Sequence, residues 1–271
     1  MSLDQLQPYY GLKSLPFTRD IAPGALFASR AHQEARARIA FVIAHGAIGV
    51  ITGAVGAGKT CAARATAATL DRSRHTIIYL PNPAIGARGT CQQIVTALGG
   101  TPRFHKASLI PQAEDLLHRE RSERRKQVVV IVDEAHLLGH DQLEELRLLT
   151  NAEMDSHSPF SLLLLGQPQL RRRLRQGSFA ALDQRIALRY EIGGLTATET
   201  TDYLEHHLKL AGREDKLFSD DAITLLHDAG SGIPRALNNL ATQALIAAYA
   251  DNKSIVDESS ARAAITEVTA E

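Results

Sequence analysis

The chain has 271 residues, enough to bury a sizeable core, and this length favours one large domain with a smaller companion. Its 30 Lys and Arg residues balance its 30 Asp and Glu residues, which excludes a general electrostatic attraction to nucleic acid or to anionic membranes. The two cysteines lack metal-binding spacing, no apolar run approaches the ~18 residues of a membrane helix, and no signal-peptide core is present. We therefore expect a soluble, cytoplasmic protein without a membrane segment, in which only local basic patches would contact nucleic acid.

The first 30 residues are broken by Pro and Gly but carry many apolar side chains, which indicates a loop packed on other structure. This segment either covers the core, which we favour, or forms the edge of a lid over a ligand. The periodic apolar residues Ile39, Val42 and Ile43 then predict a helix over residues 31–45.

A complete G-x-x-x-x-G-K-[ST] pattern follows, between an apolar strand and an alanine-rich helix: VITGAVGAGKT, Val50 to Thr60. Glycines allow the backbone angles and close approaches by which successive N–H groups surround phosphate oxygens. In this pattern Lys59 reaches the β- and γ-phosphates and the Thr60 hydroxyl binds Mg²⁺. The sequence therefore predicts an ATP and Mg²⁺ site, whose loop residues are Gly53, Val55, Gly56, Ala57, Gly58, Lys59, Thr60 and Cys61.

The next segment reads as a strand over His75–Leu80, a helix capped by Thr90 and a helix that starts at Ser108. The charged run from Arg119 to Lys126 is interpreted as a solvated helix end, where basic residues suit the helix dipole. Connections between core elements can carry contacts that a rigid scaffold positions. The loop region with Arg88, Arg103 and Lys106 is therefore the better candidate for DNA contacts.

A second chemical motif begins with five consecutive β-branched residues, Val128 to Val132, which predict a central parallel strand buried on both faces. Asp133 and Glu134 follow at its carboxyl end, where open α/β sheets bind ligands. Asp133 can hold Mg²⁺ directly or through a water, and Glu134 can accept a proton from an attacking water. His136 is either a structural histidine or a relay for the phosphate state. Asp141 and Glu144 have the spacing of a capping box for the next helix.

Polar and basic residues also follow the remaining predicted strands. Gln167 comes after the buried run Phe160 to Gly166 and either touches the γ-phosphate or attacking water or serves as a structural amide. The cluster of Arg171, Arg172, Arg173 and Arg175 is either a phosphate contact or a solvated helix face. Arg185 and Arg189 precede or lie in a fifth strand, from which an arginine can reach the γ-phosphate of a neighbouring subunit.

After Gly193–Gly194 only helices are expected. Thr196 with Glu199, Ser219, Pro234 and Asp257 carry the signals of helix starts. The segment Gly232–Arg235 places an arginine at the head of a helix, where a cation opposes the dipole. Contact with nucleotide phosphate explains Arg235 better than a surface salt bridge does.

Taken together, these motifs resemble the AAA+ ATPases, and more narrowly the ExeA-type group, which includes the transposition regulators TnsC and TniB. The residues that carry this resemblance run in the same order as in that group and span nearly the whole chain: Tyr10-Gly11-Leu12, Pro16-Phe17, the phosphate loop, Val132 to His136, Leu146 to Asn151, Leu165 to Leu170 and Gly232 to Arg235.

The resemblance implies an α/β fold with a parallel sheet flanked by helices and a small C-terminal helical lid. Residues 1–194 would form the AAA+ domain with its packed N-terminal segment, and residues 195–271 the lid. Lys59, Thr60, Asp133 and Glu134 match the Walker residues. Gln167 takes the sensor-one place, where many relatives have asparagine, and Arg235 the sensor-two place. Arg185 is our first choice for the arginine that acts in trans, before Arg189 and Arg147.

The resemblance also implies partners. Secretion-linked members carry a membrane span and a cell-wall-binding region after the ATPase, which this sequence lacks, so its length is closer to the transposon-encoded members. Our leading hypothesis is a Mg²⁺-dependent ATP hydrolase that assembles as a ring or filament on double-stranded DNA and serves a transposase as target-selection factor. The alternatives are an ExeA-like ATPase of a secretion or pilus-assembly system and a nucleotide-operated scaffold with little turnover.

Overall fold

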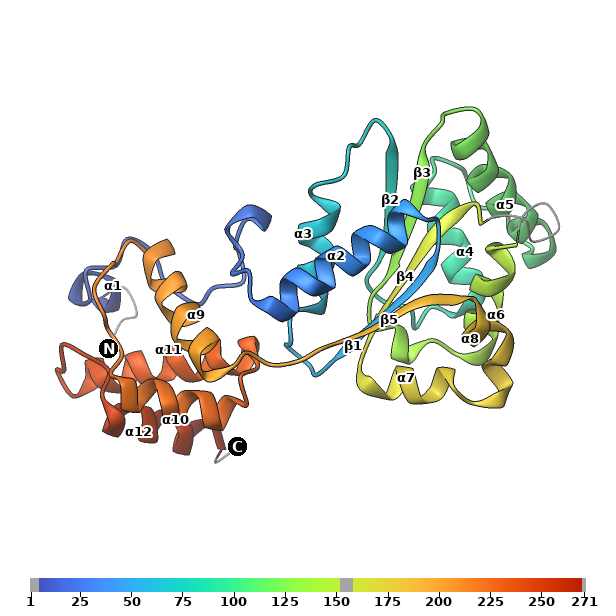
Figure 1. Cartoon of the computed structure of the whole chain (residues 1–271). Coiled ribbons are helices and arrows are strands. Elements are labelled where there is room, and N and C mark those ends of the chain that lie inside the picture. The colour runs from blue at the N-terminus through green and yellow to red at the C-terminus, as the bar shows by residue number, and fades with distance from the viewer. Residues whose placement is uncertain (1–4, 152–157, 270–271) are drawn as a thin grey trace. The chain divides into compact units, whose positions relative to one another are not determined.

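The computed structural model describes residues 5–151 and 158–269, and these residues form two compact units (Figure 1). We call residues 32–54 and 59–192 the sheet unit, and residues 5–31, 55–58 and 193–269 the helical unit. Within the described residues, no helix combines the length and the apolar character needed to cross a membrane.

The sheet unit is built on five parallel strands in the order β2-β3-β4-β1-β5. Interior strands of such a sheet are covered on both faces, which explains why their sequences are continuous apolar runs. The expected parallel sheet is confirmed, and the predicted strands at 75–80 and 160–166 match the observed ones. The strands are β1 (Ile48–Gly53), β2 (His75–Leu80), β3 (Gln127–Val132), β4 (Phe160–Gly166) and β5 (Ile186–Ile192).

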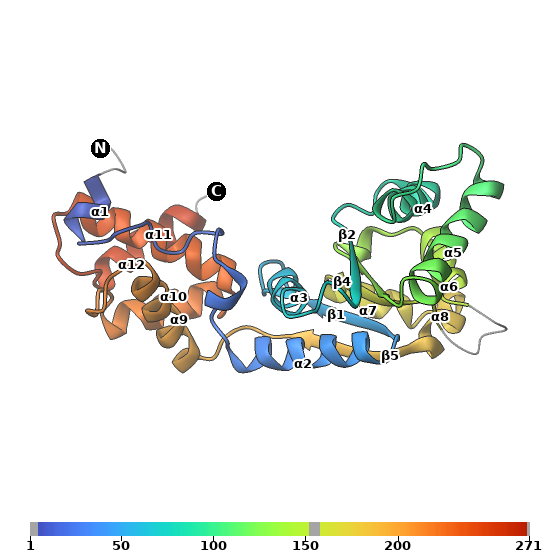
Figure 2. The same cartoon turned by 90° about the horizontal axis from the view of Figure 1, so that it is seen from above.

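Helices cover both faces of this sheet (Figures 1 and 2). On one face lie α2 (Arg30–Ala44) and α3 (Lys59–Ala67), and α2 comes so close that a Cβ on Gly49 would lie 2.6 Å from a Val42 methyl carbon. The other face packs Ile48, Val50 and the even-numbered residues of β3 and β4 into the larger apolar core. The helices on that face are α4 (Gly86–Ala97), α5 (Lys106–Ser122), α6 (His140–Leu149), α7 (Pro168–Leu174) and α8 (Ala180–Arg185).

Three predicted helix starts in this unit are wrong. The helix expected from Ser108 begins at Lys106, and the Ser108 hydroxyl donates to the His105 carbonyl at 3.0 Å inside it. Thr90 does not cap α4, because the helix begins at Gly86 and the buried Thr90 hydroxyl donates to the Gly86 carbonyl inside it. The capping interaction of α6 uses Gln142, whose side-chain oxygen accepts the Gly139 N–H at 2.9 Å. Glu144 instead pairs with an arginine one turn later on the same helix. Hydroxyl and carboxyl side chains occur at several spacings near helix starts, so tertiary packing decides which one is used.

The helical unit contains the short helix α1 and the four C-terminal helices. Thr196 and Glu199 form the predicted capping box of α9, and the Ser219 hydroxyl accepts the Ala222 N–H at the start of α10. Pro234 begins α11, and Asp257 accepts the Ser260 N–H at the start of the last helix. The elements are α1 (Leu6–Tyr9), α9 (Ala197–Leu210), α10 (Asp220–Gly230), α11 (Pro234–Ala250) and α12 (Glu258–Thr269).

The N-terminal segment belongs to the helical unit, which corrects its expected place in the α/β domain. Leu6, Tyr10, Leu12 and Phe17 lie in the apolar core of the C-terminal helices. The Tyr10 hydroxyl donates to the Lys253 carbonyl at 3.2 Å, across more than two hundred residues of sequence. The segment does cover a core, as expected, but its contacts are with the end of the chain, and local sequence patterns do not reveal such pairing.

A buried histidine makes the stability of this unit depend on pH. His207 stacks on Phe17 with ring centroids 5.4 Å apart, and burial, followed by the charge of His206, lowers the pKa of His207 to about 4. In the unfolded chain a histidine titrates near pH ~6.5, so the unfolded state binds more protons between these two values. Stability therefore falls as the pH drops from about 6.5 towards 4.

We expect the free energy of unfolding to be about 2 kcal/mol lower at pH 5 than at pH 7 through this residue alone. Urea unfolding at the two pH values measures the difference, and His207→Leu should remove most of it. The exposed His118 provides the control, since His118→Gln should leave the pH dependence unchanged. An unaltered pH dependence in His207→Leu would contradict the assignment.

Candidate nucleotide-binding site

The glycine-rich loop connects β1 to α3 in the arrangement that the sequence predicts. Gly56 and Gly58 have φ angles of 84° and 96°, which only glycine adopts without strain. The Lys59 side chain is buried, and its ammonium donates to the carbonyls of Gly53 and Ala54, both at 2.9 Å. The loop thus curls around the lysine amine at a helix N-terminus, which is the geometry of a phosphate cradle. Of the other loop residues, Ala57 is buried, Cys61 is half-buried, and Val55 is exposed.

Gly56 is also required by a close approach within the helical unit, to which residues 55–58 belong. A Cβ on Gly56 would lie only 2.4 Å from the Cβ of Arg235, and the Arg235 N–H donates to the Gly56 carbonyl at 3.4 Å. The Arg235 backbone therefore lies next to Gly56. Its guanidinium is exposed and makes no hydrogen bond or ion pair with the described residues.

The Asp133 carboxylate is held by three donors at the end of β3. Its Oδ2 accepts the Thr60 hydroxyl at 2.8 Å and the Tyr79 hydroxyl at 2.9 Å, while Oδ1 accepts the Glu134 N–H at 2.9 Å. The hydroxyl and the carboxylate predicted to bind Mg²⁺ are thus in direct contact, although they are far apart in the sequence. Tyr79 was not among the predicted site residues. Tyr79 is the next-to-last residue of β2 and pairs with Ile131 of β3. This position near the carboxyl end of a strand could have marked it as a site residue.

Tyr79 should hold Asp133 in the orientation that a metal needs. Burial, followed by the hydrogen bond to Asp133, raises the pKa of Tyr79, so the hydroxyl remains a donor at neutral pH. We expect Tyr79→Phe to weaken divalent-metal affinity about tenfold, as loss of a residue that orients a metal ligand usually does. Electron paramagnetic resonance of Mn²⁺ titrated into the ADP-bound protein measures this affinity. Tyr9→Phe, which removes a hydroxyl from the helical unit, is the control, and equal affinities in both variants would contradict the role.

Glu134 adopts a left-handed backbone conformation, with φ 49° and ψ 34°. Side chains other than glycine rarely occupy this region, and such residues cluster at functional sites. The Glu134 side chain is half exposed, and its Oε2 lies 3.3 Å from Nδ1 of the buried His136. The carboxylate is therefore open to solvent beside the Thr60 and Asp133 pair. The contact with Glu134 is compatible with either expected role of His136.

Gln167 lies at the same edge of the sheet, between the two motifs. Strand β4 pairs with β1 on one side and β3 on the other, and Thr52 is aligned with Gly166. Gln167 therefore stands level with Gly53, at the position before Pro168 that begins α7. The strand order thus brings the phosphate loop, the acidic pair and this amide to adjacent strand ends, as the sequence predicts for a nucleotide site.

The residues present fit a nucleoside triphosphate with Mg²⁺. The positive-φ glycines, the helix N-terminus and the Lys59 amine provide donors for phosphate oxygens. Thr60 and Asp133 provide two oxygen ligands, and Mg²⁺ is commonly held by few protein oxygens together with water and phosphate oxygens. Bound here, ATP would supply the phosphoryl group to be transferred and Mg²⁺ would neutralise its charge.

The three candidate trans arginines differ in their partners. Arg185, the last residue of α8, donates to the Thr150 hydroxyl at 3.2 Å and to the Asn151 side chain. Arg189 is paired with Asp183 at 2.6 Å, and Arg147 with Glu144 at 2.5 Å. Both of these guanidinium groups therefore have a carboxylate partner. Arg185 remains our first choice for the arginine that acts in trans.

The predicted DNA contacts also differ among themselves. The Arg88 guanidinium lies 4.7 Å from the ring centroid of Phe104, whose side chain is 74% exposed. The Arg103 N–H donates to the Gln112 side chain, and the Arg103 side chain has no partner among the described residues. Lys106 instead forms a 2.7 Å ion pair with the buried Glu145. Arg88 and Arg103 are available to a partner, whereas Lys106 has a partner within the fold.

Lys106→Ala should therefore act first on stability. Removing the lysine leaves the buried Glu145 carboxylate without its cation, which costs several kcal/mol for a fully buried pair. Because the Lys106 side chain is about half exposed, we expect a smaller loss of about 1–2 kcal/mol in the free energy of unfolding. Urea unfolding measures it, with Arg103→Ala as the control that should stay within about 0.5 kcal/mol of the native value.

Two comparisons relate this chain to known sequences. Residues 43–174 match the AAA domain family. The chain is similar to the general secretion pathway protein A of Aeromonas hydrophila, with 33% identity over 246 residues, which cover 89% of this chain and 44% of that protein. The chain therefore spans less than half the length of this curated relative.

Solved structures show the same architecture. Cdc6p from Pyrobaculum aerophilum aligns with a TM-score of 0.72 at 15% identity, over 93% of this chain and 70% of that one. Drosophila ORC bound to DNA aligns with a TM-score of 0.68 at 19% identity, over 98% of this chain and 66% of that one. At these identities the likeness concerns the fold alone.

Proposed function

We propose that this chain, which has the P-loop NTPase fold of the AAA+ ATPases, hydrolyses ATP with Mg²⁺ and serves a protein secretion system as an ExeA-type ATPase does. The carrying observation is the 2.8 Å contact of Thr60 with Asp133 beside the buried Lys59 amine. These three groups come from two distant motifs and together supply a phosphate donor and two metal ligands.

Hydrolysis needs a base near the transferred phosphoryl group, and Glu134 is the residue placed for it. The Glu134 carboxylate is half exposed. The Glu134 backbone N–H donates a 2.9 Å hydrogen bond to the carboxylate of Asp133, the neighbouring residue. Glu134 accepts a proton from the attacking water, whose oxygen forms the new bond to phosphorus as the bond to the leaving diphosphate breaks. Lys59 stabilises the phosphate charge, and Gln167 orients the water or the terminal phosphate.

The position of Arg185 in the sheet unit favours an oligomeric enzyme. It immediately precedes β5, so it lies at the amino-terminal edge of the parallel sheet, while the phosphate loop lies at the carboxyl-terminal edge. Seven residues of strand separate the two edges by about 23 Å, which exceeds the reach of an arginine side chain. An Arg185 that contacts nucleotide phosphate would therefore contact that of a neighbouring subunit, and turnover per chain should then rise with protein concentration.

The similarity to general secretion pathway protein A supports a role in secretion over transposition. The transposition hypothesis receives no support from the AAA domain match or from the curated relative, and it stands on the sequence resemblance alone. Both cysteines of the chain are free thiols, which suits an ATPase that works in the reducing cytoplasm. The chain matches less than half of the relative, so the comparison does not establish a partner in the cell envelope. Such a partner belongs to the proposal.

Deletion of the gene tests the choice of partner. Cells that lack the protein should release less secreted protein into the medium, and the native gene should restore release whereas Lys59→Ala should not. Transposition frequency should be unchanged. Normal secretion with reduced transposition would reverse the proposal, as would ATP-dependent sedimentation of the purified chain with duplex DNA. Absence of Mg²⁺-dependent phosphate release by the purified chain would overturn the enzymatic part.

A further inference from the structure

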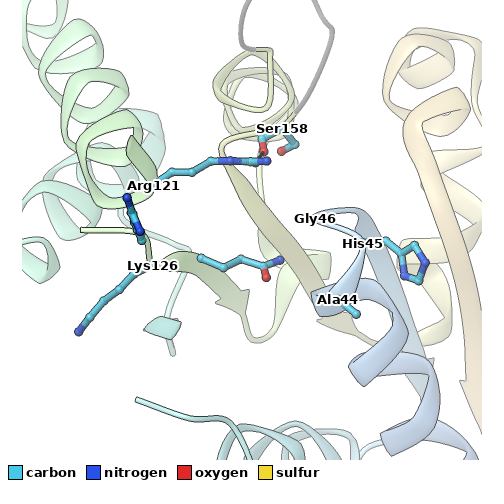
Figure 3. Close-up of a pocket in the computed structure, with 8 residues that line it drawn as sticks. Ala44, His45, Gly46, Arg121, Lys126 and Ser158 are labelled. Atoms are coloured by element: carbon cyan, nitrogen blue, oxygen red, sulfur yellow. Dashed lines mark hydrogen bonds between the residues drawn. The ribbon is translucent and has the colours of Figure 1, made fainter. Parts of the chain in front are cut away.

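A second concave site lies in the sheet unit, at the edge of the sheet opposite to the phosphate loop. The cavity has a volume of about 540 Å³ and is formed where α2 and α5 end and where β1, β3 and β4 begin. Its lining residues are Ala44, His45, Gly46, Arg121, Arg125, Lys126, Gln127 and Ser158. In Figure 3, Arg121 extends to Ser158, and Lys126 and His45 lie on opposite sides. The length of a six-residue strand, about 20 Å, separates this cavity from the phosphate loop.

The permanent charges that line the cavity are all positive. Arg121 donates to the Ser158 carbonyl at 2.7 Å, which is a neutral partner. Among the residues that the structure describes, the Arg125 guanidinium and the Lys126 ammonium have neither a hydrogen-bond partner nor an ion-pair partner. Three cations therefore surround one cavity without a carboxylate among its lining residues.

The nearest acid on α5 does not compensate these charges. Glu120 is buried, and its carboxylate is paired with Arg124 and accepts the Thr76 hydroxyl at 3.0 Å. Its charge is therefore already matched by an arginine that does not line the cavity. Among the described residues, the cavity lining therefore offers three cations and no carboxylate to an external anion.

Helix ends do not account for the whole cluster. Basic side chains in the last turn of α5 suit the helix dipole, and this explains Arg121. Arg125 and Lys126 lie beyond the helix, where the Lys126 N–H already satisfies the Glu120 carbonyl at 2.9 Å. Arg125 has a φ angle of 55°, a left-handed conformation in which glycine would be free of strain. A charged side chain stands where the backbone alone would favour glycine.

Two carbonyls in the last turn of α2 already accept hydrogen bonds from within the protein. The Ile43 carbonyl accepts the Gly46 N–H at 3.1 Å, the Ser161 hydroxyl at 3.2 Å and the side-chain amide of Gln127. The Phe41 carbonyl accepts the His45 N–H at 3.1 Å. These two acceptors already have donors within the protein, which reduces the negative charge that the end of α2 presents to the cavity.

We propose that this cavity is a phosphate site that binds a compact phosphorylated ligand, with its phosphate oxygens held by Arg121, Arg125 and Lys126. Arginine forks and a lysine ammonium are the donors that bind phosphate most strongly. A volume of this order lies within the range of small-ligand pockets, about 300–1,000 Å³, and leaves room for more than one phosphate group. A recessed cavity suits such a ligand better than a duplex, whose phosphates follow an extended surface.

Calorimetric titration with pyrophosphate, without Mg²⁺, tests the proposal independently of the ATPase function. The native protein should show two classes of site, one at the phosphate loop and one in this cavity. Lys59→Ala should remove the first, and the double variant Arg125→Gln/Lys126→Gln should weaken the second about tenfold or more. Lys209→Gln/Arg262→Gln removes the same charge from exposed positions of α9 and α12 in the helical unit and should keep both classes.

The outcomes separate the two sites. The cavity proposal is overturned if the native protein shows only the class of site that Lys59→Ala removes. It is also overturned if the second class binds pyrophosphate equally well in Arg125→Gln/Lys126→Gln. Circular dichroism of each variant shows that it is folded, and Arg121 is retained because it also supports Ser158. Titration with a short duplex DNA and with phosphatidylglycerol vesicles completes the test. If the duplex DNA or the vesicles bind in a manner that requires Arg125 and Lys126, and pyrophosphate does not bind there, the proposal of a compact ligand is wrong. The partner of the cavity is then that macromolecule or membrane.

Discussion

Replacing Glu134 by glutamine should lower ATP turnover by about 10²–10⁴-fold while ATP binding is retained. The amide keeps the size and hydrogen-bonding reach of the side chain but cannot accept the proton of the attacking water. Because Glu134 is half exposed, and its backbone N–H rather than its side chain bonds Asp133, the substitution should leave the metal ligands in place. The variant should accumulate in its ATP-bound state. Phosphate release and equilibrium binding of a fluorescent ATP analogue measure the two properties separately.

Asp141→Asn is a matched control, since this exposed carboxylate lies in the first turn of α6, seven residues further along the chain. It should leave turnover and nucleotide binding within a factor of about two of the native values. Equal turnover of Glu134→Gln and the native chain would contradict the assignment of the base. That result would favour the third hypothesis, in which the nucleotide operates a scaffold with little hydrolysis.

Lys59→Ala should weaken ATP binding by about 100-fold or more, since it removes a charge-assisted contact worth about 3 kcal/mol. The Lys59 amine is buried and donates to the carbonyls of Gly53 and Ala54. The substitution therefore removes a positively charged donor from the cradle. Turnover should fall with binding, in contrast to Glu134→Gln.

Lys209→Ala removes a lysine from the exposed surface of α9 and is the charge-matched control. Fluorescence titration with the ATP analogue measures all three proteins, and urea unfolding shows whether each is folded. Native-like ATP affinity in Lys59→Ala would contradict the phosphate-binding role of the loop. A large loss of stability in that variant would show instead that the lysine mainly supports the fold.

The phosphate loop and the acidic pair after β3 are each formed by residues that are adjacent in the chain, so they could be predicted from the sequence. Backbone demands specify the glycines of the phosphate loop, and Gly56 and Gly58 do adopt positive φ angles. Burial on both faces explains the apolar strands, and the parallel sheet then brings their carboxyl ends to one edge. The meeting of Thr60 with Asp133 follows from these two facts. For the same reason the sequence predicted that Gln167 follows β4 at this edge of the sheet.

Pairings between distant segments were decided only by the tertiary structure. Tyr79 donates to Asp133, Lys106 neutralises the buried Glu145, and the N-terminal segment joins the C-terminal helices. The same holds for the cavity, where Arg125 was expected to be part of a solvated helix end. A side chain's identity determines which partners it can accept, but its partner is set by packing between elements that are far apart in the chain. The sequence by itself therefore determined the chemistry of the nucleotide site, and the fold decided which further residues reach it and which charges remain without a partner.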